Sequence, residues 1–256
     1  MSASLITTDS DTNLARIEMA RLGFDPQAQP FVDIPLLPSI AAPYLSPKFI
    51  EMSFKQSVEW DVEPLLKDDF VTSFEAYPKH IPSAVCLPLV QRERGLTVLL
   101  TRRAGHLPAH PGQVCFPGGR IDLTDNNATH TALRETFEEV GIAPGYIQPL
   151  GKQPILITGT NYAMCPIVGL VKKGFTVNPD PAEVGQVFEV PLAVLMDPEY
   201  HRLQAFRRSL AGEQSVTHYY FSISWNGYYI WGATAAVLRN FYHYLMAASK
   251  QIALNT

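Results

Sequence analysis

The sequence predicts a mixed domain of the α/β or α+β class that follows a proline-rich N-terminal arm. Short apolar runs separated by turns are typical of strands and are found at residues 84–91, 96–103, 153–158, 165–171, 185–191, 216–225 and 227–231. Two helical patterns interrupt these runs, at residues 129–140 and 233–249. Two helices are too few for a doubly wound parallel sheet, in which a helix follows almost every strand, so that architecture is excluded.

The first part of the chain differs in composition from the rest. About half of the 21 prolines fall between Pro26 and Pro88, and each proline fixes φ and removes a backbone donor, which prevents long regular elements. One short helix is predicted within residues 11–23, where apolar residues lie near helical spacing before a glycine. We therefore divide the chain into an arm, residues 1–80, and a domain, residues 81–256.

The arm carries too many apolar residues for a disordered tail. We expect it to pack either on the domain or on a second subunit, because a solvated apolar surface of this size is unfavourable. The sequence leaves the choice open. A homodimer is possible, since two-fold dimers are common among enzymes.

Composition excludes several classes of protein. The 256 residues are 46% hydrophobic, enough for a sizeable core, and the formal net charge of -4 argues against bulk nucleic-acid binding. The three cysteines are widely spaced with no CxxC pair, so neither a disulfide framework nor a zinc ribbon is expected. The first residues do not resemble a signal peptide, and charged or polar residues interrupt the most apolar stretch, residues 228–248. These features predict a cytoplasmic protein without a membrane partner.

The helix predicted at residues 129–140 carries three glutamates on one side. At about 100° per residue, Glu135, Glu138 and Glu139 fall within one arc. The apolar positions on the opposite side are Leu133, Phe137 and Val140. Clustered carboxylates repel one another, and a divalent cation with a preference for oxygen ligands would remove that repulsion. A solvated acidic face is the alternative reading of such a pattern.

The residues around this helix favour the metal-binding alternative. Gly141 suits a left-handed cap and ends the helix just after the glutamates. Upstream, Gly118 and Gly119 allow backbone groups to approach a metal or a phosphate without a Cβ in the way. Arg134 lies within the helix and can orient a neighbouring carboxylate through an ion pair.

Residues 119–142, GRIDLTDNNATHTALRETFEEVGI, resemble the Nudix box. The matching positions are Gly119, Arg134, Glu135, Glu138, Glu139, Gly141 and Ile142. The spacer between Gly119 and Arg134 is one residue longer than in the common box, Asp125 stands at the usual glutamate position, and Thr136 fills an apolar position. The resemblance implies an α/β/α sandwich with a mixed central sheet.

Residues 99–119, LLTRRAGHLPAHPGQVCFPGG, resemble the signature of the coenzyme A diphosphatase branch of the Nudix hydrolases. That branch also carries the longer spacer, whereas Ala104 and Pro108 depart from its usual serine and arginine. The resemblance extends from about Ser83 to the C-terminal helix and leaves the arm unexplained. It implies metal-dependent hydrolysis of the diphosphate of coenzyme A or an acyl-CoA to 3',5'-ADP and 4'-phosphopantetheine.

The resemblance also implies roles for individual residues. Glu135, Glu138 and Glu139 would hold Mg²⁺ or Mn²⁺, and Arg134 would orient Glu135 or Glu138. The proton of the attacking water would go either to a glutamate of the box or to Glu183 on a later loop. Residues 91–120 hold five arginines and one acid, which suits a polyanionic substrate. The residues expected to bind that substrate are Arg103, His110, Gly118 and Gly119.

Other readings of the sequence stay open. A Nudix diphosphatase could act on ADP-ribose, a dinucleotide or a nucleotide sugar, and a Nudix-like module could bind a nucleotide without turnover. Arg92 and Arg94 are interpreted as turn residues. The aromatic residues between 219 and 231 could stack an adenine, but at strand spacing they favour a core. The histidines interpreted as surface or core residues are His80, His106, His130, His201, His218 and His243.

Overall fold

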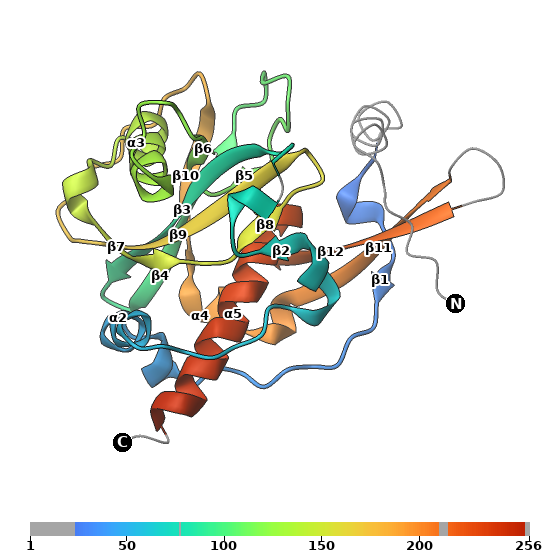
Figure 1. Ribbon diagram of the computed structural model, residues 1–256, viewed down its shortest axis with the longest axis horizontal. Coiled ribbons are helices and arrows are strands. Elements are labelled where there is room, and N and C mark those ends of the chain that lie inside the picture. The colour runs from blue at the N-terminus through green and yellow to red at the C-terminus, as the bar shows by residue number, and fades with distance from the viewer. Residues whose placement is uncertain (1–23, 77, 210–214, 254–256) are drawn as a thin grey trace.

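The computed structural model describes residues 24–76, 78–209 and 215–253, and the helix predicted within residues 11–23 lies outside them. The centre of the molecule is a nine-stranded sheet with the order β10-β4-β3-β9-β8-β2, to which β5, β6 and β7 add at β4, β3 and β9 (Figure 1). Its strands are β2 (Phe70–Val71), β3 (Ile81–Arg92), β4 (Gly95–Arg103), β5 (Val114–Cys115), β6 (Gly118–Arg120), β7 (Ile147–Lys152), β8 (Ile155–Ile157), β9 (Tyr162–Val171) and β10 (Val184–Pro191). Because β3 and β9 run parallel while the other pairs are antiparallel, the sheet is mixed, as expected.

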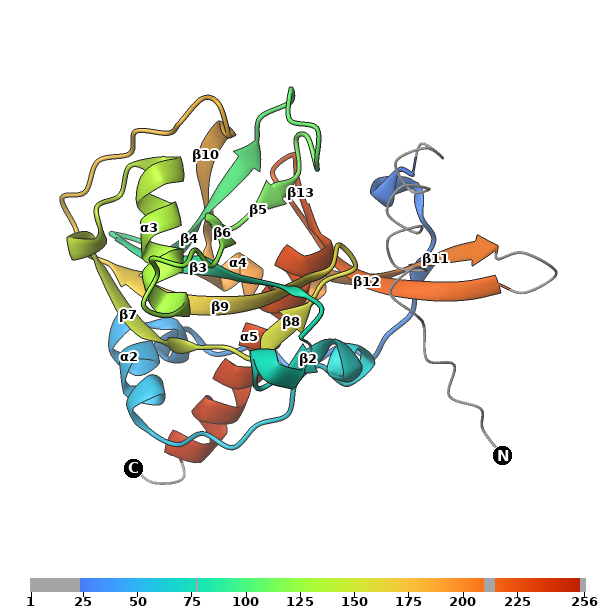
Figure 2. The ribbon, with the colours of Figure 1, turned by 45° about the horizontal axis from the view of Figure 1, so that its top comes forward.

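One long helix covers each face of this sheet (Figures 1 and 2). Side chains of a strand alternate between faces, so Cys86 of β3 packs with α3 (Ala128–Val140), whereas the next residue, Leu87, packs with α5 (Gly232–Ala253). The predicted helices and strands of the domain are thus present, with ends that differ by a few residues. No helix in the described part of the chain is long and apolar enough to cross a membrane.

A second, four-stranded sheet has the order β1-β11-β12-β13. Its strands are β1 (Phe31–Val32), β11 (His201–Ser209), β12 (Ser215–Trp225) and β13 (Tyr228–Trp231). The hairpin of β11 and β12 projects from the body of the molecule (Figure 2). The sequence does not predict β11, whose apolar residues are mixed with arginines, or β7, where Pro149 and Gly151 coincide with a register shift.

The described part of the arm packs on its own domain. Its strands β1 and β2 pair with β11 and β8, and its apolar residues join the same core as α5. The arm also contains the helix α2 (Pro47–Lys55), which the sequence analysis does not predict. The remaining short helices are α4 (Leu192–Leu195) and 3-10 turns at Pro26–Ala28, Ala42–Leu45, Pro64–Asp69, Phe74–Ala76, Pro144–Tyr146 and Pro198–Tyr200.

A buried polar cluster joins the arm to α5. Glu63 Oε2 accepts from Arg239 Nε at 2.7 Å and lies 2.8 Å from His243 Nε2, and the side chains of Glu63 and Arg239 are each only 5% exposed. Burial opposes ionisation of Glu63, but the hydrogen bonds from His243 and Arg239 outweigh it and lower its pKa to about 2. His201 Nδ1 accepts from Arg239 Nη1 at 3.2 Å, and burial lowers the pKa of His201 to about 4.

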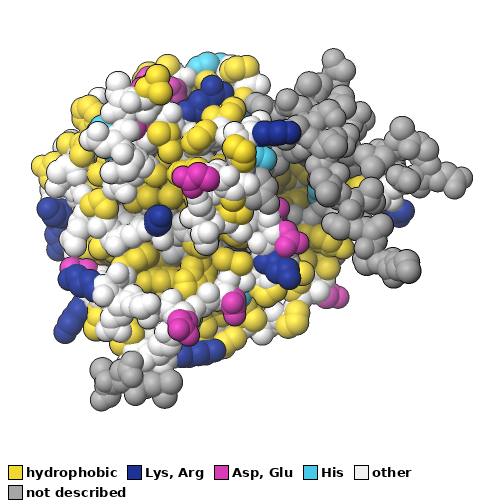
Figure 3. Space-filling view, viewed as in Figure 1, with side chains coloured by type: hydrophobic (Ala, Val, Ile, Leu, Met, Phe, Trp, Pro, Cys, Tyr) yellow, Lys and Arg dark blue, Asp and Glu magenta, His cyan; other side chains and the backbone are white. Residues whose placement is uncertain are grey.

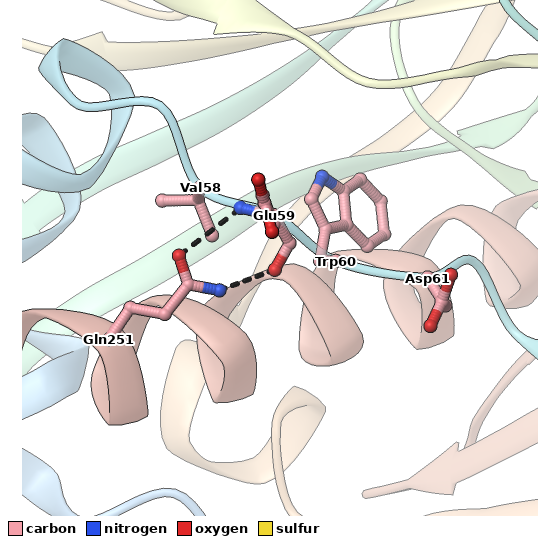
Figure 4. A pocket seen from close by; sticks show the side chains of 5 residues that line it. All are labelled: Val58, Glu59, Trp60, Asp61 and Gln251. Carbon is pink, nitrogen blue, oxygen red and sulfur yellow. Dashed lines mark hydrogen bonds between the residues drawn. The ribbon is translucent and has the colours of Figure 1, made fainter.

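The surface carries no dominant charge on the face seen in Figure 3, where acidic and basic side chains are interspersed among apolar ones. A shallow hollow lies between the arm and the end of α5, lined by Val58, Glu59, Trp60, Asp61 and Gln251 (Figure 4). There the Gln251 amide bonds to both the backbone N–H and the carbonyl of Glu59. The hollow therefore lies along the contact between the arm and the domain.

Candidate active site

The glutamate-bearing helix α3 has a defined start and end. The side chain of Asn127 accepts from His130 N–H at 3.0 Å and caps the N-terminus. Gly141 adopts a left-handed conformation with φ 77° and donates its N–H to Phe137 O, which ends the helix where the sequence predicts. The three glutamates therefore occupy the last two turns of the helix.

The predicted division of α3 into an apolar face and a carboxylate face is wrong in two positions. Phe137 is 52% exposed, whereas the carboxylate-bearing Glu139 is only 5% exposed. The face against the sheet is formed by Ala132, Thr136 and Val140, which follow one another at intervals of four residues. Two of these side chains are small, so the helix lies close to the sheet and Glu139 is buried beside it.

The glycine pair explains how carboxylates fit at this position. Gly118 and Gly119 form β6 and pair with Val85 and Ala84 of β3. A Cβ on Gly119 would lie 2.5 Å from the carboxylate carbon of Glu135, and one on Gly118 would lie 2.5 Å from the backbone oxygen of Ala84. Gly118 therefore allows β6 to approach β3, and Gly119 makes room for Glu135.

Arg134 connects the acidic residues of the site. Its Nη1 donates to Glu135 Oε1 at 2.8 Å and to Glu138 Oε2 at 2.9 Å, while Nε and Nη2 donate to Asp125 at 3.0 and 2.8 Å. Nη2 also donates to the carbonyl of Arg120 at 3.2 Å. The hydrogen bonds from Arg134 hold the pKa of Asp125, whose side chain is fully buried, well below its usual range. Asp125 thus fixes Arg134, which in turn holds Glu135 and Glu138.

Glu139 lies in the most unfavourable environment for a negative charge. Burial and, after it, the charges of Glu135 and Glu183 raise its pKa to about 8, while Arg103 and the N–H of Gly118 oppose this shift. Burial also raises the pKa of Glu135. Glu183, whose side chain is exposed on the loop before β10, is therefore close enough to act on both helix carboxylates.

Arg103 begins the loop that forms another side of the site. Its Nε donates to Ala109 O at 3.4 Å, and its charge acts on Glu139. His110 lies at the far end of this loop, where it has a left-handed φ of 56° and is half-buried. The structure thus brings the charge of Arg103 to the carboxylates and places His110 on the loop that follows Arg103. Arg92 lies elsewhere, paired with Glu189 at the turn between β3 and β4.

Two residues that the sequence analysis leaves out of the site belong to its framework. The carbonyl of Asp180 accepts from Glu183 N–H at 3.1 Å, and its own N–H donates to Glu139 O at 3.0 Å. His106 Nε2 lies 3.1 Å from Ala182 O. The Asp-Pro turn at residues 180–181 is a recognisable signal for Asp180, whereas no sequence pattern indicates the partner of His106.

The chemistry of this cluster suits a hard divalent cation. Glu135 and Glu139 offer carboxylate oxygens, and burial together with the charges of Glu135 and Glu183 raises the pKa of Glu139, so a bound cation would stabilise its ionised form. In the described part of the chain no three His, Cys, Asp or Glu side chains are gathered closely enough to form a complete metal site. The ion pairs of Arg134 with Glu135 and Glu138 keep these two carboxylates turned toward the guanidinium.

A mixed sheet between two helices, with the glutamates of one helix beside a glycine strand, indicates the class of Nudix hydrolases, enzymes that act on phosphoric anhydrides and generally use divalent metal ions. The NUDIX domain model matches residues 79–211, and the chain belongs to this family. The resemblance of residues 119–142 to the Nudix box is thereby confirmed.

Relatives of this chain agree with this assignment. The Nudix hydrolase NudL of Photorhabdus laumondii is 38% identical over 180 residues, which are 66% of this chain and 92% of the relative. NudL of Escherichia coli K12 is 37% identical over 185 residues, 68% of this chain and 92% of the relative. A Nudix hydrolase from M. smegmatis, RenU, is 19% identical with a TM-score of 0.38, and the match covers 44% of this chain and 71% of that one.

Proposed function

We propose that this protein hydrolyses the diphosphate bond of coenzyme A or an acyl-CoA, giving 3',5'-ADP and 4'-phosphopantetheine or its acyl form. The observation that carries the proposal is the position of residues 99–119, the segment that resembles the coenzyme A diphosphatase branch. This segment supplies Arg103 beside Glu139, the N–H of Gly118 that acts on Glu139, and Gly119 in contact with Glu135.

In the proposed mechanism the carboxylates of α3 would hold Mg²⁺ or Mn²⁺. Glu135 and Glu139 would be the chief ligands, and Glu138 would complete the set. Such a cation would neutralise charge on the diphosphate and lower the pKa of a coordinated water. Arg134 keeps Glu135 and Glu138 in place through its two ion pairs. Glu183 or Glu139 accepts the proton of the attacking water, because both lie next to the carboxylate cluster.

Substrate binding is assigned to the loop and the glycine strand. Arg103 and His110 offer cationic or hydrogen-bonding groups to phosphate oxygens, and the guanidinium can form two parallel bonds with one phosphate. Gly118 and Gly119 present bare backbone to the diphosphate. Coenzyme A carries a 3'-phosphate that ADP-ribose lacks, and a contact of Arg103 or His110 with that phosphate would favour coenzyme A.

A matched set of substrates tests this assignment. We would measure kcat/KM for coenzyme A, dephospho-coenzyme A and ADP-ribose with Mg²⁺ and with Mn²⁺. Dephospho-coenzyme A differs from coenzyme A only by the 3'-phosphate, and we expect it to be cleaved about tenfold less efficiently, the loss of one charge-assisted contact. Equal values for all three substrates would contradict the preference for coenzyme A. Cleavage of ADP-ribose alone would assign the protein to another Nudix substrate class.

Location and assembly remain predictions. A cytoplasmic location is proposed from the cysteine pattern, which favours a reducing compartment. The proposed partner is a small molecule, with neither nucleic acid nor membrane involved. Analytical ultracentrifugation of the purified chain tests the homodimer, whose measured mass would be twice the 28.4 kDa of one chain.

A further inference from the structure

Glu183 differs from the other acids of the site because it does not lie on α3. It lies near the end of the segment between β9, which ends at Val171, and β10, which begins at Val184. A glutamate on an exposed loop is normally mobile, and a group that accepts a proton in catalysis must be held within hydrogen-bond reach of its target. A catalytic role for Glu183 therefore requires hydrogen bonds that hold this loop in place.

The first support comes from the end of α3. Asn178 N–H donates to Val140 O at 2.9 Å, and Asp180 N–H donates to Glu139 O at 3.0 Å. Asp180 then closes a turn, because its side chain accepts from Ala182 N–H at 2.8 Å and its carbonyl accepts from Glu183 N–H at 3.1 Å. The loop is thus tied to the same helical turn that carries Glu139.

The second support comes from the loop after Arg103, residues 104–113. Ala104 N–H donates to Glu183 O at 2.9 Å, and the Nε2 of His106 lies 3.1 Å from Ala182 O. A carbonyl can only accept, so the imidazole donates its Nε2–H in this bond. The bond is available to both the Nε2–H tautomer and the doubly protonated ring.

These bonds together fix the backbone on both sides of Glu183. The peptide group before its Cα comprises Ala182 O and Glu183 N–H, which are held by His106 and Asp180. The peptide group after its Cα includes Glu183 O, which is held by Ala104 N–H. Because φ and ψ define the orientation of the two peptide groups, their fixation also sets the direction in which the Cβ leaves the chain.

We propose that His106 is a positioning residue that holds the Ala182–Glu183 peptide group, and thereby directs the Glu183 carboxylate toward the carboxylates of α3. The inference rests on the role of Glu183 in the proposed function. His106 acts through the backbone and does not touch the substrate. It also links the substrate-binding loop to the loop of the candidate base, so the two sides of the site are held as a unit.

The test combines a structural and a kinetic measurement on the full chain. Hydrogen exchange of a peptide that covers residues 176–186 is compared in wild type, His106→Ala and His106→Gln, without substrate. His106 is exposed, so its replacement should leave the fold intact. We expect faster exchange in His106→Ala and near-wild-type exchange in His106→Gln, whose amide retains a donor. Unchanged exchange in His106→Ala would overturn the inference, whatever the activity of the protein.

The kinetic measurement is a double-mutant cycle with Glu183→Gln. We expect His106→Ala to lower kcat about tenfold with KM nearly unchanged, because a carboxylate displaced by a fraction of an ångström loses part of its effect. In the Glu183→Gln background the same change should have no further effect. An equal loss in both backgrounds, or a change in KM alone, would overturn the inference. If the wild type cleaves no diphosphate, the proposed function is contradicted instead. Hydrogen exchange then still tests whether His106 holds the loop of Glu183.

Discussion

Gly119→Ala is the substitution that separates the function of the glycine strand from its contribution to stability. The added Cβ would lie 2.5 Å from the carboxylate carbon of Glu135 and 2.5 to 2.6 Å from its oxygens. Non-bonded carbon atoms prefer about 3.5 Å, so the carboxylate must move by about 1 Å. A displacement of that size in a catalytic group costs about 10²-fold in rate, or about 3 kcal/mol of barrier. We therefore expect kcat to fall by about two orders of magnitude.

The same substitution should hardly affect folding. Gly119 does not have a positive φ, so alanine can adopt its backbone conformation. The atoms that the Cβ would meet belong to the end of the Glu135 side chain, which can rotate away. We expect the free energy of unfolding, measured by urea denaturation, to change by less than about 1 kcal/mol.

Two other glycines serve as controls for Gly119→Ala. A Cβ on Gly118 would meet backbone atoms of Ala84 and Val85 at 2.5 to 2.6 Å, so Gly118→Ala should destabilise the protein by about 2 kcal/mol or more. Gly105 has no atom within 4 Å of its Cβ position, so Gly105→Ala should leave stability close to that of wild type. Full activity of Gly119→Ala, or a loss of activity that merely follows a loss of stability, would refute the reasoning.

Further predictions concern the ion pairs and the arm. Asp125→Asn leaves the guanidinium of Arg134 without its buried partner, and should lower the free energy of unfolding by about 2 kcal/mol in urea melts; an unchanged midpoint would contradict the role given to Asp125. Glu63→Gln should cost about 3 kcal/mol at pH 7, because Arg239 is buried with it. The pKa of Glu63 is lowered from 4.5 to about 2 on folding, so its stabilisation is present above about pH 4.5 and is lost as the pH falls toward 2. The difference in unfolding free energy between wild type and Glu63→Gln should shrink over that range, and a constant difference would exclude the ion pair as its source. Residues 81–256 expressed alone should lack a cooperative thermal transition, since the arm contributes to the core around α5; a sharp transition near that of the full chain would contradict this.

Sequence alone predicts those elements whose signals are local. The helix α3 starts one residue before the predicted range and ends at the predicted residue, because a glycine at position 141 favours a left-handed cap that ends the helix. By contrast, α2 lies in a segment where prolines suggest irregular structure. Its signal is the pair Ser46 and Pro47, since the serine caps the helix and proline is well suited to its first position.

The sequence predicts the part of the candidate site that lies on a single helix, because that signal is local. The motif places Arg134 and the glutamates on one helix, but a helical projection does not contain the strand that the helix faces. The exposure of Phe137 and the burial of Glu139 follow from the small residues at the sheet contact, and the position of Glu135 follows from the space above Gly119. The contact of His106 is with a backbone carbonyl, which every residue possesses, so no residue pattern can indicate it.

The central claim is that the α3 carboxylates support metal-dependent cleavage of a diphosphate. The most direct test incubates wild type and Glu139→Gln with coenzyme A, with and without Mg²⁺ or Mn²⁺, and identifies the products by mass spectrometry. The account predicts 3',5'-ADP and 4'-phosphopantetheine from the wild type only when metal is present, and a loss of at least about 10²-fold in the variant. Equal product formation by a folded Glu139→Gln, or by the wild type without metal, would contradict the account.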